Sequence, residues 1–203
     1  TVKPTKNIKE TALALADAAL VGARGNSGII FAQFLYGFSK DIKGQETMNL
    51  KEFSENMHIA SECAYYALAK PKEGTMISVI RDWADFLCEN YDTTDDITTL
   101  LLNALTVAME SLKGTGKFIA AKAKTIVDAG AKGFVVFLEG MCEYFHSGEK
   151  TVQVANAEII DSEWLGEDNH EDITFRYCTE ALLIGENLER EKLSSMIESM
   201  GDC

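Results

Sequence analysis

The chain has little proline and no long apolar run, and both shortages limit what it can be. Only two prolines occur in 203 residues, so most of the sequence can form uninterrupted helices, whose interiors proline would break. No apolar run approaches the 18 residues or so of a membrane-spanning helix. The first residues, TVKPTKNIKE, lack the apolar stretch of a signal peptide. We therefore predict no transmembrane segment.

Basic residues are also scarce. The 19 lysines and arginines are outnumbered by 32 aspartates and glutamates, which gives a net charge of −13. No basic cluster is present to displace counterions from a nucleic acid, so the sequence predicts no nucleic-acid partner. An acidic surface repels phosphates, and an anion site would therefore need main-chain N–H groups or a bound metal.

The five cysteines form no CxxC pair and show no regular spacing. They are Cys63, Cys88, Cys142, Cys178 and Cys203. Three of them fall on helical patterns as small apolar residues, which is common for free cysteine. This usage predicts a reduced, cytoplasmic protein without a disulfide framework.

Apolar residues repeat at helical spacing through the first 148 residues. The pattern predicts seven helices with short connections, at about 6–21, 27–41, 50–69, 75–91, 97–112, 116–127 and 133–146. Thr94 is the expected N-cap of the fifth. Short connections between helices favour antiparallel neighbours, so we predict a mainly α fold built as an antiparallel helical bundle or barrel.

The pattern changes after Gly148. Residues 151–160 alternate like a strand, 161–172 form an acidic linker, and 173–185 are again strand-like before a helix that opens near 188. We therefore divide the chain into a helical domain at 1–148, a strand and linker at 149–172, and the start of a small α/β domain at 173–203.

Three loops rich in small residues each precede a predicted helix. The first, GARGNSG (22–28), contains three glycines, each of which costs a helix interior about 1 kcal/mol relative to alanine. Ser27 is placed to cap the next helix, and such a turn can present several N–H groups to a phosphate. A tight helix–helix turn with an N-cap explains the same residues. The other two loops are 70–76 (KPKEGTM) and 128–133 (DAGAKG).

The three loops could meet at one end of a bundle. In an antiparallel assembly this requires an even number of helices between successive loops. The helices listed above place the third loop before the seventh helix, and so at the opposite end. Either the helix count between 92 and 127 is wrong, or the loops do not form one site.

Four segments, in order and at suitable intervals, resemble a known family: ADAALVGARGNSGIIFAQFLYGF, AKPKEGTM, VDAGAKGF and FRYCTEALLIG. Together they are similar to the ATP-binding subunit of bacterial fatty-acid kinase, whose first domain resembles the L domain of dihydroxyacetone kinases. A close variant fuses this domain to a DegV-type fatty-acid-binding domain. The resemblance implies a closed eight-helix barrel, N-terminally incomplete here, with ATP or ADP across one end.

The resemblance also implies nine nucleotide-binding residues: Asn26, Ser27, Gly28, Gly74, Thr75, Met76, Asp128, Ala129 and Gly130. Ser27 and Gly28 match the phosphate-contacting Ser-Gly pair. The loop at 74–76 approaches the nucleotide, with Met against the base, and 128–130 match the lid. Ala131 replaces a glycine common in fatty-acid kinases. Cys178 matches a cysteine that can bind Zn²⁺ together with two later histidines, which are absent here.

The family's magnesium-binding Asp-Gly-Asp-Thr-Gly run is also absent. It precedes the first helix of the family, where this chain has TVKPTKNIKE, and the group of Asp92, Asp95 and Asp96 lies on a different connection. Because phosphoryl transfer depends on charge neutralisation by Mg²⁺, we expect the magnesium ligands upstream, no catalytic residue in this chain, and no turnover by this chain alone. It is then the interior of a larger kinase subunit.

Three hypotheses of function remain. In the first, the chain is the ATP-binding part of a kinase that phosphorylates a fatty acid held by a DegV-type partner or fused domain. In the second, it is a non-catalytic helical interaction or regulatory module. In the third, it belongs to a dihydroxyacetone-type small-molecule kinase. A homo-oligomer is compatible with each, and an Asp-x-Asp upstream of Thr1 would favour a kinase.

Overall fold

The computed structural model describes residues 5–44, 46–68, 70–119, 127–148 and 183–201, and these residues form seven helices and no strand. The chain divides into two compact units, Thr1–Lys150 and Thr151–Cys203. The mainly α fold predicted from the sequence is confirmed for the described residues.

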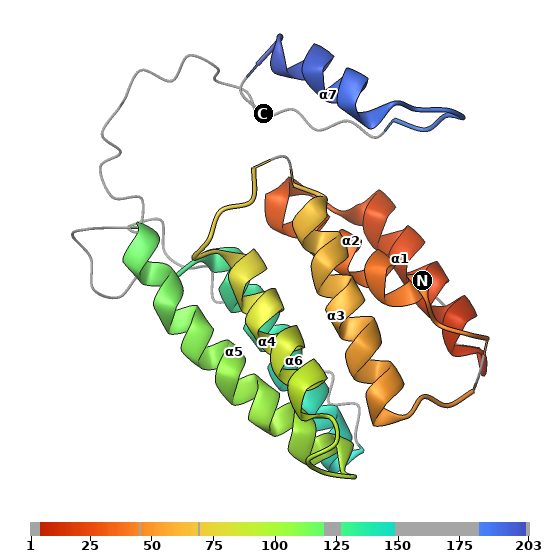
Figure 1. The fold of residues 1–203 in the computed structure, drawn as a ribbon, viewed down its shortest axis with the longest axis vertical. Helices are drawn as coiled ribbons and strands as arrows, with labels where there is room; N and C mark the ends of the chain where they lie inside the picture. Colours follow the sequence, from red (N-terminus) through yellow and green to blue (C-terminus); the bar gives the residue numbers. More distant parts are fainter. Residues whose placement is uncertain (1–4, 45, 69, 120–126, 149–182, 202–203) are drawn as a thin grey trace. The chain divides into compact units, whose positions relative to one another are not determined.

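The described part of the first unit contains six helices: α1 (Ile8–Gly22), α2 (Gly25–Lys40), α3 (Leu50–Tyr66), α4 (Met76–Asn90), α5 (Ile97–Ile119) and α6 (Ala129–Ser147). Each packs against the next in the chain, and α6 also packs against α4. Successive helices run in opposite directions (Figure 1). The connections before α2, α4 and α6 therefore lie at the same end of the unit, which we call the loop end. The eight-helix barrel implied by the resemblance stays an expectation.

Aromatic side chains join α2, α4 and α6 in the core. Phe34, Trp83 and Phe134 are each at most 2% exposed, and their ring centroids lie 5.5–6.3 Å apart. Burial of such large side chains is the main favourable term in the stability of this unit. Between α2 and α3 the backbones approach closely at Gly37, where a Cβ would lie 2.7 Å from the Cα of Ala60.

The predicted break between a fifth and a sixth helix does not exist. Helix α5 runs unbroken through Gly114, Thr115 and Gly116, and the segment 120–126 lies outside the described residues. The two glycines weaken a helix by about 1 kcal/mol each, but a buried stripe from Leu100 to Leu112 holds α5 against the core. Among the helices of the described residues, the third loop therefore precedes the sixth, and this count places all three loops at the loop end.

Two predicted helix starts are also corrected. Helix α2 begins at Gly25 with Arg24 as N-cap, so Ser27 lies within its first turn and does not cap it. Gly25 has a φ of 69°, which lets the chain turn from α1 into α2 within two residues. Helix α6 begins at Ala129, four residues before the predicted start.

The start of α5 is capped by Asp96 and not by Thr94. The carboxylate of Asp96 accepts hydrogen bonds from the N–H groups of Thr98 and Thr99, at 3.2 and 2.9 Å. The hydroxyl of Thr94 instead accepts the N–H of Asp96 at 3.1 Å. A carboxylate accepts N–H bonds more strongly than a hydroxyl and also suits the positive end of the helix dipole.

The described part of the second unit contains α7 (Arg190–Glu198), which agrees with the helix predicted to open near 188. The strand-like segment 151–160, the linker 161–172 and Cys178 lie outside the described residues, as does most of 173–185.

In the part of the chain that the structure describes, no helix combines the length and apolar character needed to cross a bilayer. Cys63, Cys88 and Cys142 are free thiols on α3, α4 and α6, and burial raises the pKa of each.

Candidate functional site

The first and third loops touch at the loop end. The backbone of Gly130 lies against Ser27, so that a Cβ at position 130 would overlap the Ser27 hydroxyl and lie 3.0 Å from its Cβ. Gly130 sits in the first turn of α6 and Ser27 in the first turn of α2. Only glycine allows this approach without a shift of the serine, so the pair fixes how closely the two helix starts meet.

The second and third loops are joined by one carboxylate. Oδ1 of Asp128 accepts the N–H of Met76, the first residue of α4, at 3.1 Å. The same oxygen accepts the N–H of Ala131 at 2.7 Å and so caps α6. Asp128 thereby satisfies one N–H at the start of each of two helices, and it holds those helix starts together.

A pocket of about 490 Å³ opens beside these contacts. Five of the nine predicted residues line it: Ser27, Gly28, Met76, Ala129 and Gly130. The other lining residues, which the sequence analysis did not assign to the site, are Phe31, Gly133, Phe134 and Phe137. Phe134 and Phe137 recur at i, i+3 spacing on α6, and Phe31 has the same spacing from the core residue Phe34 on α2. This helical spacing was their only signal in the sequence. The pocket is therefore formed by the starts of α2, α4 and α6 and by the rings of Phe31, Phe134 and Phe137, which we call the aromatic wall.

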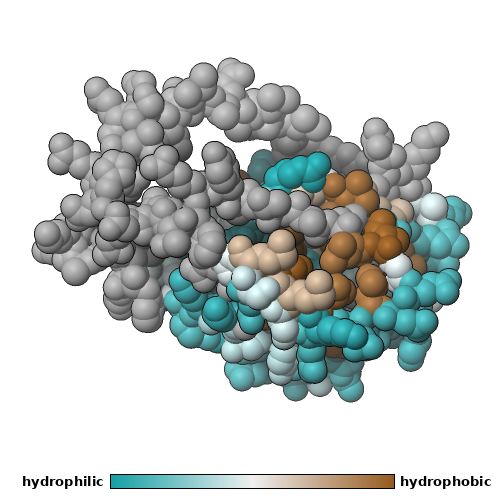
Figure 2. All heavy atoms as spheres, turned by 90° about the horizontal axis from the view of Figure 1, so that it is seen from above, coloured by the Kyte–Doolittle hydropathy of each residue, from teal (hydrophilic) through white to brown (hydrophobic). Residues whose placement is uncertain are grey.

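Phe137 and Phe31 form the outer part of that wall. Their rings meet edge to face with centroids 5.1 Å apart, and Phe137 is 42% exposed. Seen from above, the molecule shows a group of hydrophobic side chains, coloured brown in Figure 2. Val21 at the end of α1 is 67% exposed. An exposed aromatic edge of this kind can stack against a planar ligand.

The remaining predicted residues lie next to the pocket without lining it. Asn26 is exposed in the first turn of α2, and Asp128 acts through its hydrogen bonds. Thr75 is the N-cap of α4, but its hydroxyl donates to the carbonyl of Lys72 at 2.8 Å and caps no helix N–H. Gly74 is buried with a φ of 75°, a conformation that favours glycine.

The second loop is held by a polar network. The N–H of Gly74 donates to the Ser78 hydroxyl at 2.9 Å, and that hydroxyl donates to Glu73 at 2.7 Å. Both guanidinium NH₂ groups of Arg81 donate to the Glu73 carboxylate. Hydrogen bonds from Arg81 and then Ser78 lower the pKa of Glu73 from 4.5 to about 2, while Glu73 raises the pKa of Arg81. The carboxylate stays ionised and keeps this loop in one conformation.

The start of α2 is the least satisfied of the three helix starts. No side chain in the described part of the chain caps it, whereas Asp128 bonds the first N–H of α4 and caps α6. The N–H groups of an uncapped first turn attract anions, an effect that the helix dipole reinforces. The arrangement can therefore accept a phosphate at Ser27 and Gly28.

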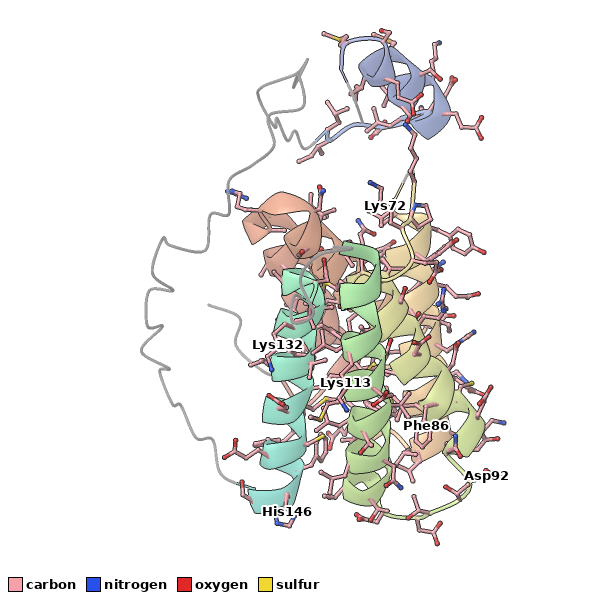
Figure 3. All side chains as sticks on the ribbon, turned by 90° about the vertical axis from the view of Figure 1, so that its left-hand side faces the viewer. Lys72, Phe86, Asp92, Lys113, Lys132 and His146 are labelled. Carbon is pink, nitrogen blue, oxygen red and sulfur yellow. The ribbon has the colours of Figure 1, made fainter. Side chains whose placement is uncertain are left out.

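Figure 3 labels polar side chains toward both ends of the unit. Lys72 lies at the loop end and Lys132 is in the upper half of α6, whereas Asp92 and His146 are at the opposite end (Figure 3). Among the residues described, no three His, Cys, Asp or Glu side chains are grouped as a metal site would require. Asp92 is thus remote from the pocket, as its position on a different connection predicted.

Comparison with known proteins identifies the family of the helical unit. The family model of the DAK2 domain matches residues 1–143, which cover nearly the whole helical unit. The chain belongs to the DAK2 domain family. This is the family of dihydroxyacetone kinase L domains, so the helical unit is a domain associated with kinases.

Two relatives extend the similarity beyond the DAK2 domain. An uncharacterized protein of Staphylococcus epidermidis is 33% identical over 211 residues, covering 98% of this chain and 38% of the relative. An uncharacterized protein of Staphylococcus aureus is 35% identical over 187 residues, covering 88% of this chain and 34% of the relative. The chain therefore spans little more than a third of the length of these curated relatives.

Proposed function

We propose that the pocket at the loop end of the DAK2 unit binds ATP. The observation that carries this proposal is the convergence of Ser27, Met76 and Gly130, from three separate loops, on one pocket of about 490 Å³. A volume of this size lies within the range of small-molecule and cofactor sites, about 300–1,000 Å³. Ser27 and Gly28 would hold phosphate, and Met76 with Phe31 and Phe137 would contact the base.

The residues of the pocket fit a nucleotide in three respects. The first turn of α2 offers N–H groups without a side-chain cap, and Gly130 leaves room for the Ser27 side chain at the same place. The aromatic wall provides a surface on which a base can stack. Because the chain carries a net charge of −13, a triphosphate would be held through main-chain N–H groups and bound Mg²⁺.

We further propose that the full-length protein is a cytoplasmic kinase that transfers the ATP γ-phosphate to a fatty acid held by a DegV-type partner or fused domain. Mg²⁺ would neutralise phosphate charge in this reaction, with its ligands expected upstream of Thr1. The DAK2 unit would bind and orient ATP. Zn²⁺ at Cys178 is a separate proposal, because that residue lies outside the described part of the chain.

A turnover assay of the full-length protein tests this proposal. It should transfer phosphate from Mg-ATP to a fatty acid only when a DegV-type lipid-binding protein or fused domain is present. Transfer to dihydroxyacetone instead would favour a small-molecule kinase. Mg-ATP binding without transfer to any acyl substrate, in a protein with intact upstream carboxylates, would favour the regulatory module. Ser27→Ala in the same assay should lower activity at limiting ATP.

A further inference from the structure

Thr115 is buried near the end of α5, and its hydroxyl is bonded on both sides. The residue is 1% exposed. Oγ1 donates to the carbonyl of Leu112, one turn earlier in α5, at 2.7 Å. The same oxygen accepts the main-chain N–H of Asp128 at 3.0 Å. One hydroxyl thus links the end of α5 to the residue that caps α6.

The link continues from Asp128 to the pocket. The Asp128 carboxylate bonds the N–H groups of Met76 and Ala131, and Met76 lines the pocket. Gly130, two residues later, lies against Ser27. The position of the Asp128 backbone therefore affects both the second loop, through Met76, and the first loop, through Gly130.

We infer that Thr115 is a positioning residue of the nucleotide site, an inference that rests on the proposed binding of ATP. Its hydroxyl holds the Asp128 N–H, and this fixes the point from which the Asp128 carboxylate reaches Met76. Without the hydroxyl, the Asp128 N–H must find another acceptor, and an unpaired N–H so close to the core is costly. The Asp128 carboxylate would then move relative to α4, and the distance between the second and third loops would no longer be fixed.

Two substitutions of Thr115 in the full-length protein separate the effect of its hydroxyl from the effect of its side-chain shape. Thr115→Val keeps the branched shape and removes the hydroxyl, whereas Thr115→Ser keeps the hydroxyl. Thr106→Val is a matched control, because Thr106 is an exposed residue of α5 whose hydroxyl, among the described residues, bonds only the carbonyl of Leu102 in its own helix. Folding of each variant is checked by circular dichroism.

Two readouts test the inference. In hydrogen exchange without nucleotide, Thr115→Val should speed exchange in peptides covering Met76 and Asp128 by roughly tenfold, the effect of losing one such hydrogen bond. Mg-ATP affinity, measured by calorimetry, should fall about tenfold, because the free energy of this hydrogen bond no longer helps to hold the loops in the binding arrangement. Thr115→Ser should stay within about twofold of the wild type in both readouts, and Thr106→Val should match the wild type.

The outcomes distinguish this inference from the proposed function. If Thr115→Val leaves exchange at Met76 and Asp128 unchanged, or if Thr115→Ser is as damaging as Thr115→Val, the positioning role is wrong. If the wild-type protein does not bind Mg-ATP, the nucleotide proposal fails, and the exchange comparison still decides whether Thr115 positions the two loops. Altered exchange together with wild-type affinity would restrict Thr115 to a structural role and overturn the inference.

Discussion

The backbone of Gly130 lies so close to the side chain of Ser27 that a methyl group at position 130 would overlap the Ser27 hydroxyl. The two residues are more than 100 positions apart in the sequence, yet they line the same pocket. Gly130 lies inside a helix, where glycine is otherwise unfavourable, and it is not among the glycines with positive φ. The close approach of α2 therefore explains this glycine better than backbone conformation does.

Gly130→Ala should weaken Mg-ATP binding by roughly 5- to 150-fold, because the new methyl group displaces Ser27 from the pocket. This range corresponds to the cost of about 1–3 kcal/mol that is typical of overpacking. Calorimetry of the full-length protein measures the effect. Gly140→Ala on the same helix is the control. Its Cβ would meet nothing within 4 Å, so it should leave affinity unchanged and stabilise the fold by about 0.4–1 kcal/mol. Equal affinities for the two variants would count against the Ser27–Gly130 contact.

Ser27→Ala should weaken ATP binding by roughly 10- to 150-fold, the effect of losing one charge-assisted hydrogen bond of about 1.5–3 kcal/mol. Ser54→Ala is a matched control. Ser54 lies near the start of α3, away from the loop end (Figure 1), and its buried hydroxyl has no hydrogen-bond partner among the described residues. This control should leave both affinity and stability close to wild type. Similar affinity losses for both serines would contradict a phosphate contact at Ser27.

Phe137→Ala should lower ATP affinity by about two- to tenfold, since an aromatic contact contributes about 0.5–1.5 kcal/mol. The effect on stability should be small, because Phe137 is already 42% exposed. Val136→Ala is the control, since Val136 is 51% exposed and is not among the lining residues. Titrations with ATP and with inorganic triphosphate separate the contribution of the base to binding from that of the phosphates. The Phe137→Ala variant should lose affinity for ATP and keep its affinity for triphosphate.

The ion pair of Glu73 with Arg81 should make stability depend on pH. Because the pKa of Glu73 is lowered to about 2 in the folded protein, its contribution is present above about 4.5, the unfolded value, and is lost as the pH falls toward 2. Both side chains are partly exposed, so we expect at most about 1 kcal/mol. Denaturant unfolding at pH 7 should show Glu73→Gln less stable than wild type, with the difference shrinking toward pH 2. A constant difference across this range would refute the assignment.

The sequence predicted the helices well where burial and local pattern agree. The stripe of α5 and the glycine-rich starts of α2, α4 and α6 could be found without a structure. Gly114 and Gly116 misled the helix count because glycine marks a break locally, and only tertiary packing shows that the helix continues. Ser27 was mistaken for an N-cap because the turn at Gly25 begins the helix two residues earlier.

The candidate site could be predicted only in part, because some of its residues belong to local motifs and others are brought to it only by folding. Loop residues such as Gly28 and Met76 stand out in local motifs, and the structure places both at the pocket. Phe31 and Phe137 were missed because helical spacing shows that a residue shares a face with others but not what that face meets. Thr115 was missed because its partner, Asp128, is 13 residues away and joins it only in the folded protein.

Hydrogen exchange of the full-length protein with and without Mg-ATP tests the central claim most directly. If the loop end binds the nucleotide, Mg-ATP should slow exchange together in peptides covering 25–31, 74–79 and 128–137, while α3 near Ser54 stays unchanged. Protection confined to other parts of the protein, with these three segments unaffected by saturating Mg-ATP, would show that the pocket between Ser27, Met76 and Gly130 is not the nucleotide site.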